Sequence, residues 1–270
     1  MNYRHIYHAG NFADVMKHAL LLRLLAAMRR KPKPFLALDT HAGIGRYDLA
    51  RAEAEKTGEW RQGVGRLLDQ APPALAEYAG MVRRLGLYPG SPVIIAAALR
   101  PDDRLVACEL HPQDAAALRL ALRPYPNAAA HQRDGYEALG AFLPPPERRA
   151  LALIDPPFER PDEFPLLARG LAAAWRKFPA AVTAIWYPIK HRAPVRAFFT
   201  ALRETPIRDV ITAELRLRPD TDPSRLNGCG LGLINSPYGF AEEAAPILAA
   251  CAELFGDAGA GSGVERIIDE

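Results

Sequence analysis

Four short apolar segments of this 270-residue chain are each followed within two residues by an acidic side chain. Runs of this length are typical of buried strands in a parallel sheet. The carboxyl ends of parallel strands meet at one edge of the sheet, where α/β proteins bind their ligands. A single acidic residue there is an ordinary turn residue, but four in series predict an α/β fold with a functional site at that edge. The segments are residues 35–38, 105–108, 128–132 and 151–154, and the acidic residues are Asp39, Glu109, Asp134 and Asp155.

Three further apolar segments, residues 182–187, 210–215 and 230–235, complete a predicted seven-stranded sheet. Helical patterns separate the first two of them. The last two are joined by the polar stretch 218–227, which is too polar for a packed crossover helix, so an antiparallel final pair is expected. The tail at residues 257–263 is rich in Gly and Ala and is expected to be mobile.

The segment 46–90 separates the first two predicted strands and contains two helical patterns. We expect a small helical subdomain inserted into a single domain that spans residues 1–270. The preceding turn, residues 39–45, contains Gly43 and Gly45, which let the backbone approach a ligand closely. It lacks the third glycine of the dinucleotide fingerprint, so an NAD site is not favoured. Ser91 is predicted to be the N-cap of the following helix, with Pro92 at its first position.

The tetrapeptide 155–158, Asp-Pro-Pro-Phe, fits a site that methylates an amino group. The lone pair of an aromatic amine is delocalised, and hydrogen-bond acceptors that hold its hydrogens direct that lone pair at a methyl donor. The Asp155 carboxylate and the Pro156 carbonyl are suitable acceptors, and Phe158 could stack on an extruded base. Asp and Pro are also common in turns, so the tetrapeptide alone leaves both interpretations open.

The first predicted helix, residues 11–29, carries Asn11, Asp14 and His18 on one face, with Lys17 close by. Such a group is more often a solvated helix face than part of a site.

Composition sets further bounds. No apolar run approaches the ~18 residues of a membrane span, and the N-terminal residues lack the apolar core of a signal peptide, so a cytosolic location is expected. The three cysteines are far apart and signal neither a disulfide framework nor a zinc site. The net charge of +3 permits nucleic-acid binding without indicating it.

Several motifs together resemble the bacterial 23S rRNA adenine-N6 methyltransferases that modify adenine 2030, within the class I S-adenosyl-L-methionine-dependent methyltransferases. The likeness spans essentially the whole chain. The motifs are Tyr3-Arg4-His5, residues 8–15, residues 38–43 (Leu-Asp-Thr-His-Ala-Gly), residues 88–92, Glu109-Leu110-His111-Pro112 and Trp186-Tyr187-Pro188.

The resemblance implies a Rossmann-like fold, S-adenosylmethionine as cofactor, 23S rRNA as partner and Asp155 as the catalytic residue. It also implies that Tyr3 contacts the RNA base, and it places Phe158 where the family usually has Tyr. The residues implied to hold the cofactor are His18, His41, Ser91, Glu109, Asp134, Gly135 and Asp155.

The expected reaction is direct methyl transfer to adenine N6 by a monomer, without a metal or a covalent enzyme intermediate. Two alternatives stay open. One is methylation of DNA adenine or of a protein glutamine, which also uses an Asp/Asn-Pro-Pro-aromatic turn. The other is a non-catalytic RNA-binding assembly factor on the same fold.

Overall fold

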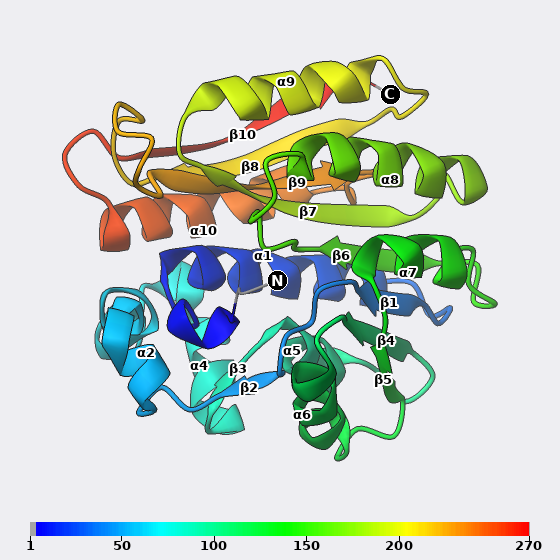
Figure 1. Cartoon of the computed structure of the whole chain (residues 1–270), viewed down its shortest axis with the longest axis horizontal. Helices are drawn as coiled ribbons and strands as arrows, with labels where there is room; N and C mark the ends of the chain where they lie inside the picture. The colour runs from blue at the N-terminus through cyan, green and yellow to red at the C-terminus, as the bar shows by residue number, and fades with distance from the viewer. Residues whose placement is uncertain (1–3, 270) are drawn as a thin grey trace.

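The computed structural model describes residues 4–269. Within them, one large sheet has the strand order β10-β8-β9-β7-β6-β1-β4-β5, and β2 pairs with β3 in a separate ribbon (Figure 1). The strands are β1 (Leu36–Asp39), β2 (Arg46–Tyr47), β3 (Tyr88–Pro89), β4 (Arg104–Glu109), β5 (Ala128–Gln132), β6 (Ala150–Ile154), β7 (Val182–Ile189), β8 (Val210–Arg216), β9 (Gly228–Ile234) and β10 (Gly261–Ile268).

The five strands from β5 to β7 are parallel, and β9 runs antiparallel to both of its neighbours, β7 and β8. The antiparallel final pair predicted from the polar linker is confirmed. The predicted count of seven strands is wrong, because the described part of the large sheet has eight. The additional strand, β10, pairs antiparallel with β8 and begins within the tail that was expected to be mobile. Hydrogen bonding along β8 orders the end of this tail despite its glycines.

Helices cover both faces of the sheet (Figure 1). Successive residues of a strand point to opposite faces of the sheet, so the buried apolar residues form two cores. Ala37 and Leu153 belong to the core under α1, α5 and α10. Leu38 and Ile154 belong to the core under α7, α8 and α9. The helices are α1 (Phe12–Arg29), α2 (Ala52–Thr57), α3 (Arg66–Asp69), α4 (Ala76–Leu85), α5 (Ser91–Ala98), α6 (Pro112–Leu122), α7 (Gly135–Phe142), α8 (Glu163–Lys177), α9 (Arg192–Arg203) and α10 (Phe240–Phe255), with short η segments at His5–Tyr7, Arg61–Gly65 and Pro73–Leu75.

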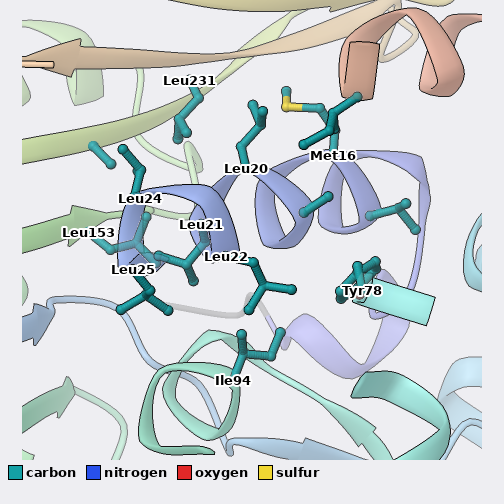
Figure 2. Packing of buried hydrophobic residues seen from close by; sticks show 14 of the residues in the cluster. Met16, Leu20, Leu21, Leu22, Leu24, Leu25, Tyr78, Ile94, Leu153 and Leu231 are labelled. Atoms are coloured by element: carbon teal, nitrogen blue, oxygen red, sulfur yellow. The ribbon is translucent and has the colours of Figure 1, made fainter. Parts of the chain in front are cut away.

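Helix α1 is enclosed on most sides. Its leucines point in several directions, with Leu20 and Leu24 near Leu231 of the sheet and Leu22 near Ile94 of α5 (Figure 2). A helix that is apolar around most of its circumference is one that is buried. The polar residues of its first two turns are therefore carried into the interior rather than into solvent.

The segment 46–90 contains α2, α3 and α4 and lies on the α1 side of the sheet (Figure 1). It is tied to the residue before the N-cap of α1 by the Val64 N–H, which donates to the carbonyl of Gly10 at 2.7 Å. Gly63 allows this approach, because a Cβ there would lie 2.0 Å from the same oxygen. Among residues 4–269, none of the helices has the length and apolar character of a membrane span.

Candidate active site

A cavity of about 1010 Å³ opens at the carboxyl edge of the parallel strands. It gathers residues from α1, from the ends of β1, β4, β6 and β7, and from the start of α7. Tyr3 lies outside the described residues. The sequence-predicted site residues that line the cavity are His18, His41, Ser91, Glu109, Asp134, Gly135, Asp155, Pro156 and Phe158.

Asp39 differs from the other three acidic residues at strand ends, because its side chain does not line the cavity. It is fully buried beneath Ser91, whose hydroxyl donates to Asp39 Oδ2 at 2.7 Å, while Oδ1 has no partner among the described residues. Burial raises the pKa of Asp39 to about 7, and the charge of Asp155 contributes to the increase. The prediction that Ser91 caps its helix is wrong, because Gly90 is the N-cap and the Ser91 hydroxyl is directed to Asp39 instead.

Replacing Asp39 by Asn is expected to change the pH dependence of stability. The pKa of Asp39 in the folded protein lies above its ordinary value of 3.8. The folded state therefore keeps a proton that the unfolded state releases, and the free energy of unfolding falls as the pH rises from about 4 to about 7. Asn cannot ionise, so the variant should be more stable than the parent by roughly 1–3 kcal/mol at pH 8 and should lose that advantage near pH 4. Urea unfolding at pH 4 and pH 8 measures the free energy of unfolding of both proteins. A stability difference of the same size at both pH values would contradict the prediction.

Lys17 connects α1 to the end of β6. Its ammonium group lies 2.5 Å from Asp155 Oδ2 and 2.9 Å from Asp14 Oδ1. Burial alone would lower the pKa of Lys17, but the two carboxylates raise it well above its usual value. The ammonium is therefore charged and fixes one oxygen of Asp155, while no described residue bonds the other oxygen.

Asp14 forms the base of this network. Its Oδ2 accepts from the Gly10 N–H at 2.9 Å and lies 2.9 Å from His5 Nε2. Burial would raise the pKa of Asp14, but His5 and Lys17 hold it well below its usual value. The polar face of α1 is thus buried, and the interpretation of it as a solvated face is wrong. Sequence reasoning noted Lys17 only as a neighbour, because nothing local to α1 indicates a partner 138 residues away.

The turn after β6 carries Phe158, which lines the cavity together with Asp155 and with Trp186 of β7. Phe158 has a φ of 49°, which is unusual for a residue other than glycine. Its ring centroid lies 4.9 Å from that of Phe164 and 5.9 Å from that of Trp186. Trp186 also lies under the Lys17 ammonium, 6.0 Å from its ring centroid. The wall next to Asp155 is therefore aromatic, as a site for a nucleobase requires.

Glu109 and Asp134 are held by backbone N–H groups. Glu109 accepts from Gly43 at 3.0 Å and from His111 at 2.8 Å, one bond to each oxygen. Burial raises its pKa, and each oxygen retains a lone pair for a ligand. Asp134 caps α7 through Oδ1 and has Oδ2 unused by described residues.

Gly135 allows α7 to approach the end of β1. A Cβ at this position would lie 2.5 Å from the Thr40 carbonyl oxygen and 2.6 Å from His41 Cε1. His41 is in turn fixed through Nδ1, which lies 2.8 Å from the Thr40 hydroxyl. Burial lowers the pKa of His41 to about 4, so the imidazole is neutral at pH 7.

His18 is also neutral, because burial lowers its pKa to about 3. Its Nδ1 lies 3.2 Å from the hydroxyl of Tyr78 and 3.2 Å from that of Tyr88. The cavity is thus lined by the carboxylates of Glu109 and Asp134, by two neutral imidazoles and by the Lys17–Asp155 pair.

This donor set fits S-adenosylmethionine. Two carboxylates with free lone pairs match the ribose hydroxyls and the adenine amino group of the cofactor. Ligand pockets of about 300–1,000 Å³ hold one drug-sized molecule, so the cavity has room for the cofactor and for part of a second ligand. Among residues 4–269 no group of three or more His, Cys, Asp or Glu side chains is arranged to hold a metal ion.

Comparison with known proteins agrees with this geometry. The sequence model of the family described as "Ribosomal RNA large subunit methyltransferase D, RlmJ" matches residues 32–267. The chain is 40% identical over 247 residues to ribosomal RNA large subunit methyltransferase J of Haemophilus influenzae, with 88% of each chain covered. It is 39% identical over 246 residues to the protein of the same name from Escherichia coli, again with 88% of each covered.

The crystal structure of protein LPL1258 from Legionella pneumophila superimposes with a TM-score of 0.88 at 36% identity, covering 96% of this chain and 98% of that one. The class I methyltransferase fold predicted from the sequence is confirmed apart from the strand count. The chain therefore belongs to the RlmJ family of ribosomal RNA large subunit methyltransferases.

Proposed function

We propose that this protein transfers a methyl group from S-adenosylmethionine to N6 of an adenine in 23S rRNA, adenine 2030. The observation that carries the proposal is the placement of Asp155. Its carboxylate is anchored by Lys17 and lines the same cavity as Glu109 and Asp134. The names of the curated relatives, which specify large-subunit ribosomal RNA, support this choice of substrate.

Asp155 acts by positioning the amine. Its Oδ2 is occupied by Lys17, so Oδ1 is the oxygen that accepts a hydrogen from the adenine amino group. The Pro156 carbonyl accepts the second hydrogen, which turns the nitrogen lone pair toward the donor. Bound S-adenosylmethionine supplies an activated methyl group on its sulfonium. Asp155 need not deprotonate the amine beforehand, because the proton can leave after the nitrogen has been methylated.

We assign each of the other site residues either to the cofactor or to the target base. Glu109 accepts from the ribose hydroxyls and Asp134 from the adenine amino group of the cofactor, with Gly135 beside it. His18, His41 and Ser91 lie toward the methionine end. Phe158 stacks on the target base, a role that needs only its ring. The family's usual tyrosine hydroxyl at this position is not required for stacking.

Two exposed cations at the cavity are proposed to hold RNA phosphates. Arg66 lies on α3 and Lys190 follows β7, and both line the cavity without a side-chain hydrogen bond or salt bridge to any described residue. The logarithm of the RNA-binding constant falls linearly with the logarithm of the salt concentration. Removing one cation that binds a phosphate should make this slope shallower by about 0.7–0.9. Arg66→Gln/Lys190→Gln should therefore raise the KM for RNA roughly tenfold and leave kcat and the KM for cofactor unchanged.

The matched control is Arg119→Gln/Arg176→Gln, which removes two exposed cations that do not line the cavity. Equal effects of the two double variants, measured as KM for RNA at several salt concentrations, would contradict a phosphate role for the cavity pair.

Transfer of labelled methyl groups to three substrates tests the proposed activity. Purified protein and labelled cofactor are incubated with total RNA, total DNA or total protein from cells that lack the gene. Label in large-subunit RNA alone is expected. Label in DNA or protein would favour the alternative amino-group substrates, and cofactor binding without transfer to any of them would favour a non-catalytic RNA-binding role.

We also propose that the enzyme is a monomer that acts in the cytoplasm without a metal ion. We further propose that the chain is a single methyltransferase domain in which residues 46–90 form an inserted helical subdomain. The tie between Val64 and Gly10 supports the view that this insertion braces the N-terminal end of α1, from which Lys17 and His18 project.

A further inference from the structure

Three polar groups meet in the interior beside α1. Nδ1 of His18, the hydroxyl of Tyr78 on α4 and the hydroxyl of Tyr88 on β3 form a triangle with sides of 3.2, 3.2 and 2.9 Å. All three residues are almost completely buried. Figure 2 shows Tyr78 beside the first turns of α1. Neither hydroxyl has another hydrogen-bond partner in the described chain, so the triangle must satisfy its own donors and acceptors.

Counting protons in this triangle selects one tautomer of His18. If Nδ1 is an acceptor, one tyrosine donates to it and the second donates to the first, so both hydroxyl protons are bonded. If Nδ1 carries the proton instead, it donates to one tyrosine and that tyrosine to the other, and the last hydroxyl proton has no acceptor. A buried donor without a partner is costly. The neutral ring is therefore protonated at Nε2.

The Nε2 atom is the nitrogen of His18 left open to the cavity. His18 lines the cavity, and no described residue bonds its Nε2. The two tyrosines do not line it. Burial raises the pKa of both tyrosines and lowers that of His18 to about 3, so all three groups are neutral and the pattern holds across the physiological pH range.

We infer that Tyr78 and Tyr88 are positioning residues that hold His18 as a fixed Nε2–H donor to the carboxylate of the cofactor's methionine group. The inference rests on the proposed function for the identity of the ligand. Glu109 and Asp134 are assigned to the ribose and adenine, so the methionine group lies toward α1. That group offers an ammonium, which only donates, and a carboxylate, which only accepts. A neutral N–H donor matches the carboxylate alone.

Loss of one tyrosine hydroxyl and loss of both should have different effects on cofactor binding. Either hydroxyl alone lies close enough to donate to Nδ1, so Tyr78→Phe and Tyr88→Phe should each preserve the tautomer. The double variant Tyr78→Phe/Tyr88→Phe leaves Nδ1 without a donor. We expect each single variant to bind S-adenosylmethionine within about twofold of the parent, and the double variant to bind roughly tenfold more weakly.

Two measurements test this inference. Nitrogen-15 NMR of histidine-labelled parent protein should show a protonated Nε2 and an unprotonated Nδ1 for His18, and a proton on Nδ1 would overturn the proposal even if the double variant failed to fold. Calorimetry should then compare S-adenosylmethionine with its decarboxylated analogue. The double variant should lose affinity for the first ligand and bind the second like the parent.

Equal loss for both ligands, or no loss for either, would overturn the carboxylate assignment. Tyr187→Phe is the control for removal of a buried hydroxyl, because Tyr187 donates to Glu214 at 2.8 Å outside the cavity. A parent protein that binds the cofactor but methylates no RNA would contradict the proposed function and not this inference, since neither measurement here depends on methyl transfer.

Discussion

Asp155→Ala is expected to lower kcat by roughly 10²–10³-fold, the range typical for loss of one positioned hydrogen-bonding group that acts in the transition state. The variant removes the side-chain carboxylate that lines the cavity at the end of β6. Lys17 keeps its bond to Asp14 at 2.9 Å, so the buried ammonium is not left unpaired and the fold should persist. Affinity for S-adenosylmethionine should change little, since Glu109 and Asp134 are untouched. Single-turnover methylation and calorimetry measure the two effects separately.

Asp102→Ala is the matched control, because Asp102 is exposed and precedes β4, away from the cavity. If Asp155→Ala kept a near-normal rate, Asp155 would not be the group that holds the adenine amine. If it lost cofactor binding and turnover in equal measure, its role would be in binding the cofactor instead.

Lys17→Met is expected to destabilise the protein by about 3–5 kcal/mol, because removing one partner of a buried ion pair leaves the other uncompensated. Here the remaining carboxylates are Asp14 and Asp155. The variant should also lower kcat at least tenfold, since it removes the ammonium that fixes Oδ2 of Asp155. Urea unfolding gives the first effect, and single-turnover rates measured well below the unfolding midpoint give the second.

A second substitution separates the two roles of Lys17. Asp14→Asn removes one uncompensated carboxylate while keeping an oxygen to accept from Gly10. Lys17→Met/Asp14→Asn should therefore be more stable than Lys17→Met without being faster. A rate that recovered in step with stability would mean that Lys17 serves folding alone and does not position Asp155.

The acidic ends of the strands were predictable because they depend on local pattern and on one general rule. Each apolar run ends where the chain leaves the core, and parallel strands bring those ends to a common edge. The rule does not specify where each side chain points. Glu109, Asp134 and Asp155 line the cavity, whereas Asp39 turns beneath Ser91 and is buried.

The helix-capping rule failed at Ser91 for the same reason. The Ser91 hydroxyl can bond either the N-terminus of its helix or a buried carboxylate. The packing of α5 against β1 determines that it bonds Asp39. Strand β10 is not predicted by local pattern because it is an edge strand that begins Gly-Ser-Gly, contains Glu265 and Arg266, and is for the most part partly or fully exposed. Its order comes from pairing with β8, an interaction that no pattern within residues 261–268 encodes.

Lys17 is the site feature that sequence reasoning could least have found. Polar residues on one face of a helix are usually solvated, and this face is buried only because α1 is packed between the sheet, α5 and α10. A buried lysine requires a carboxylate partner, and this requirement is the one signal that could have linked Lys17 to Asp155. It would have been usable only once α1 was known to be enclosed.

The most direct test of the central claim is mass spectrometry of 23S rRNA fragments from cells that carry the gene, lack it, or carry the Asp155→Ala form. We predict a single methyl group on N6 of adenine 2030 in the first strain and its absence from the other two. A methyl group that persisted in the strain without the gene, or in the strain with the alanine variant, would contradict the assignment of this reaction to Asp155 and its cavity.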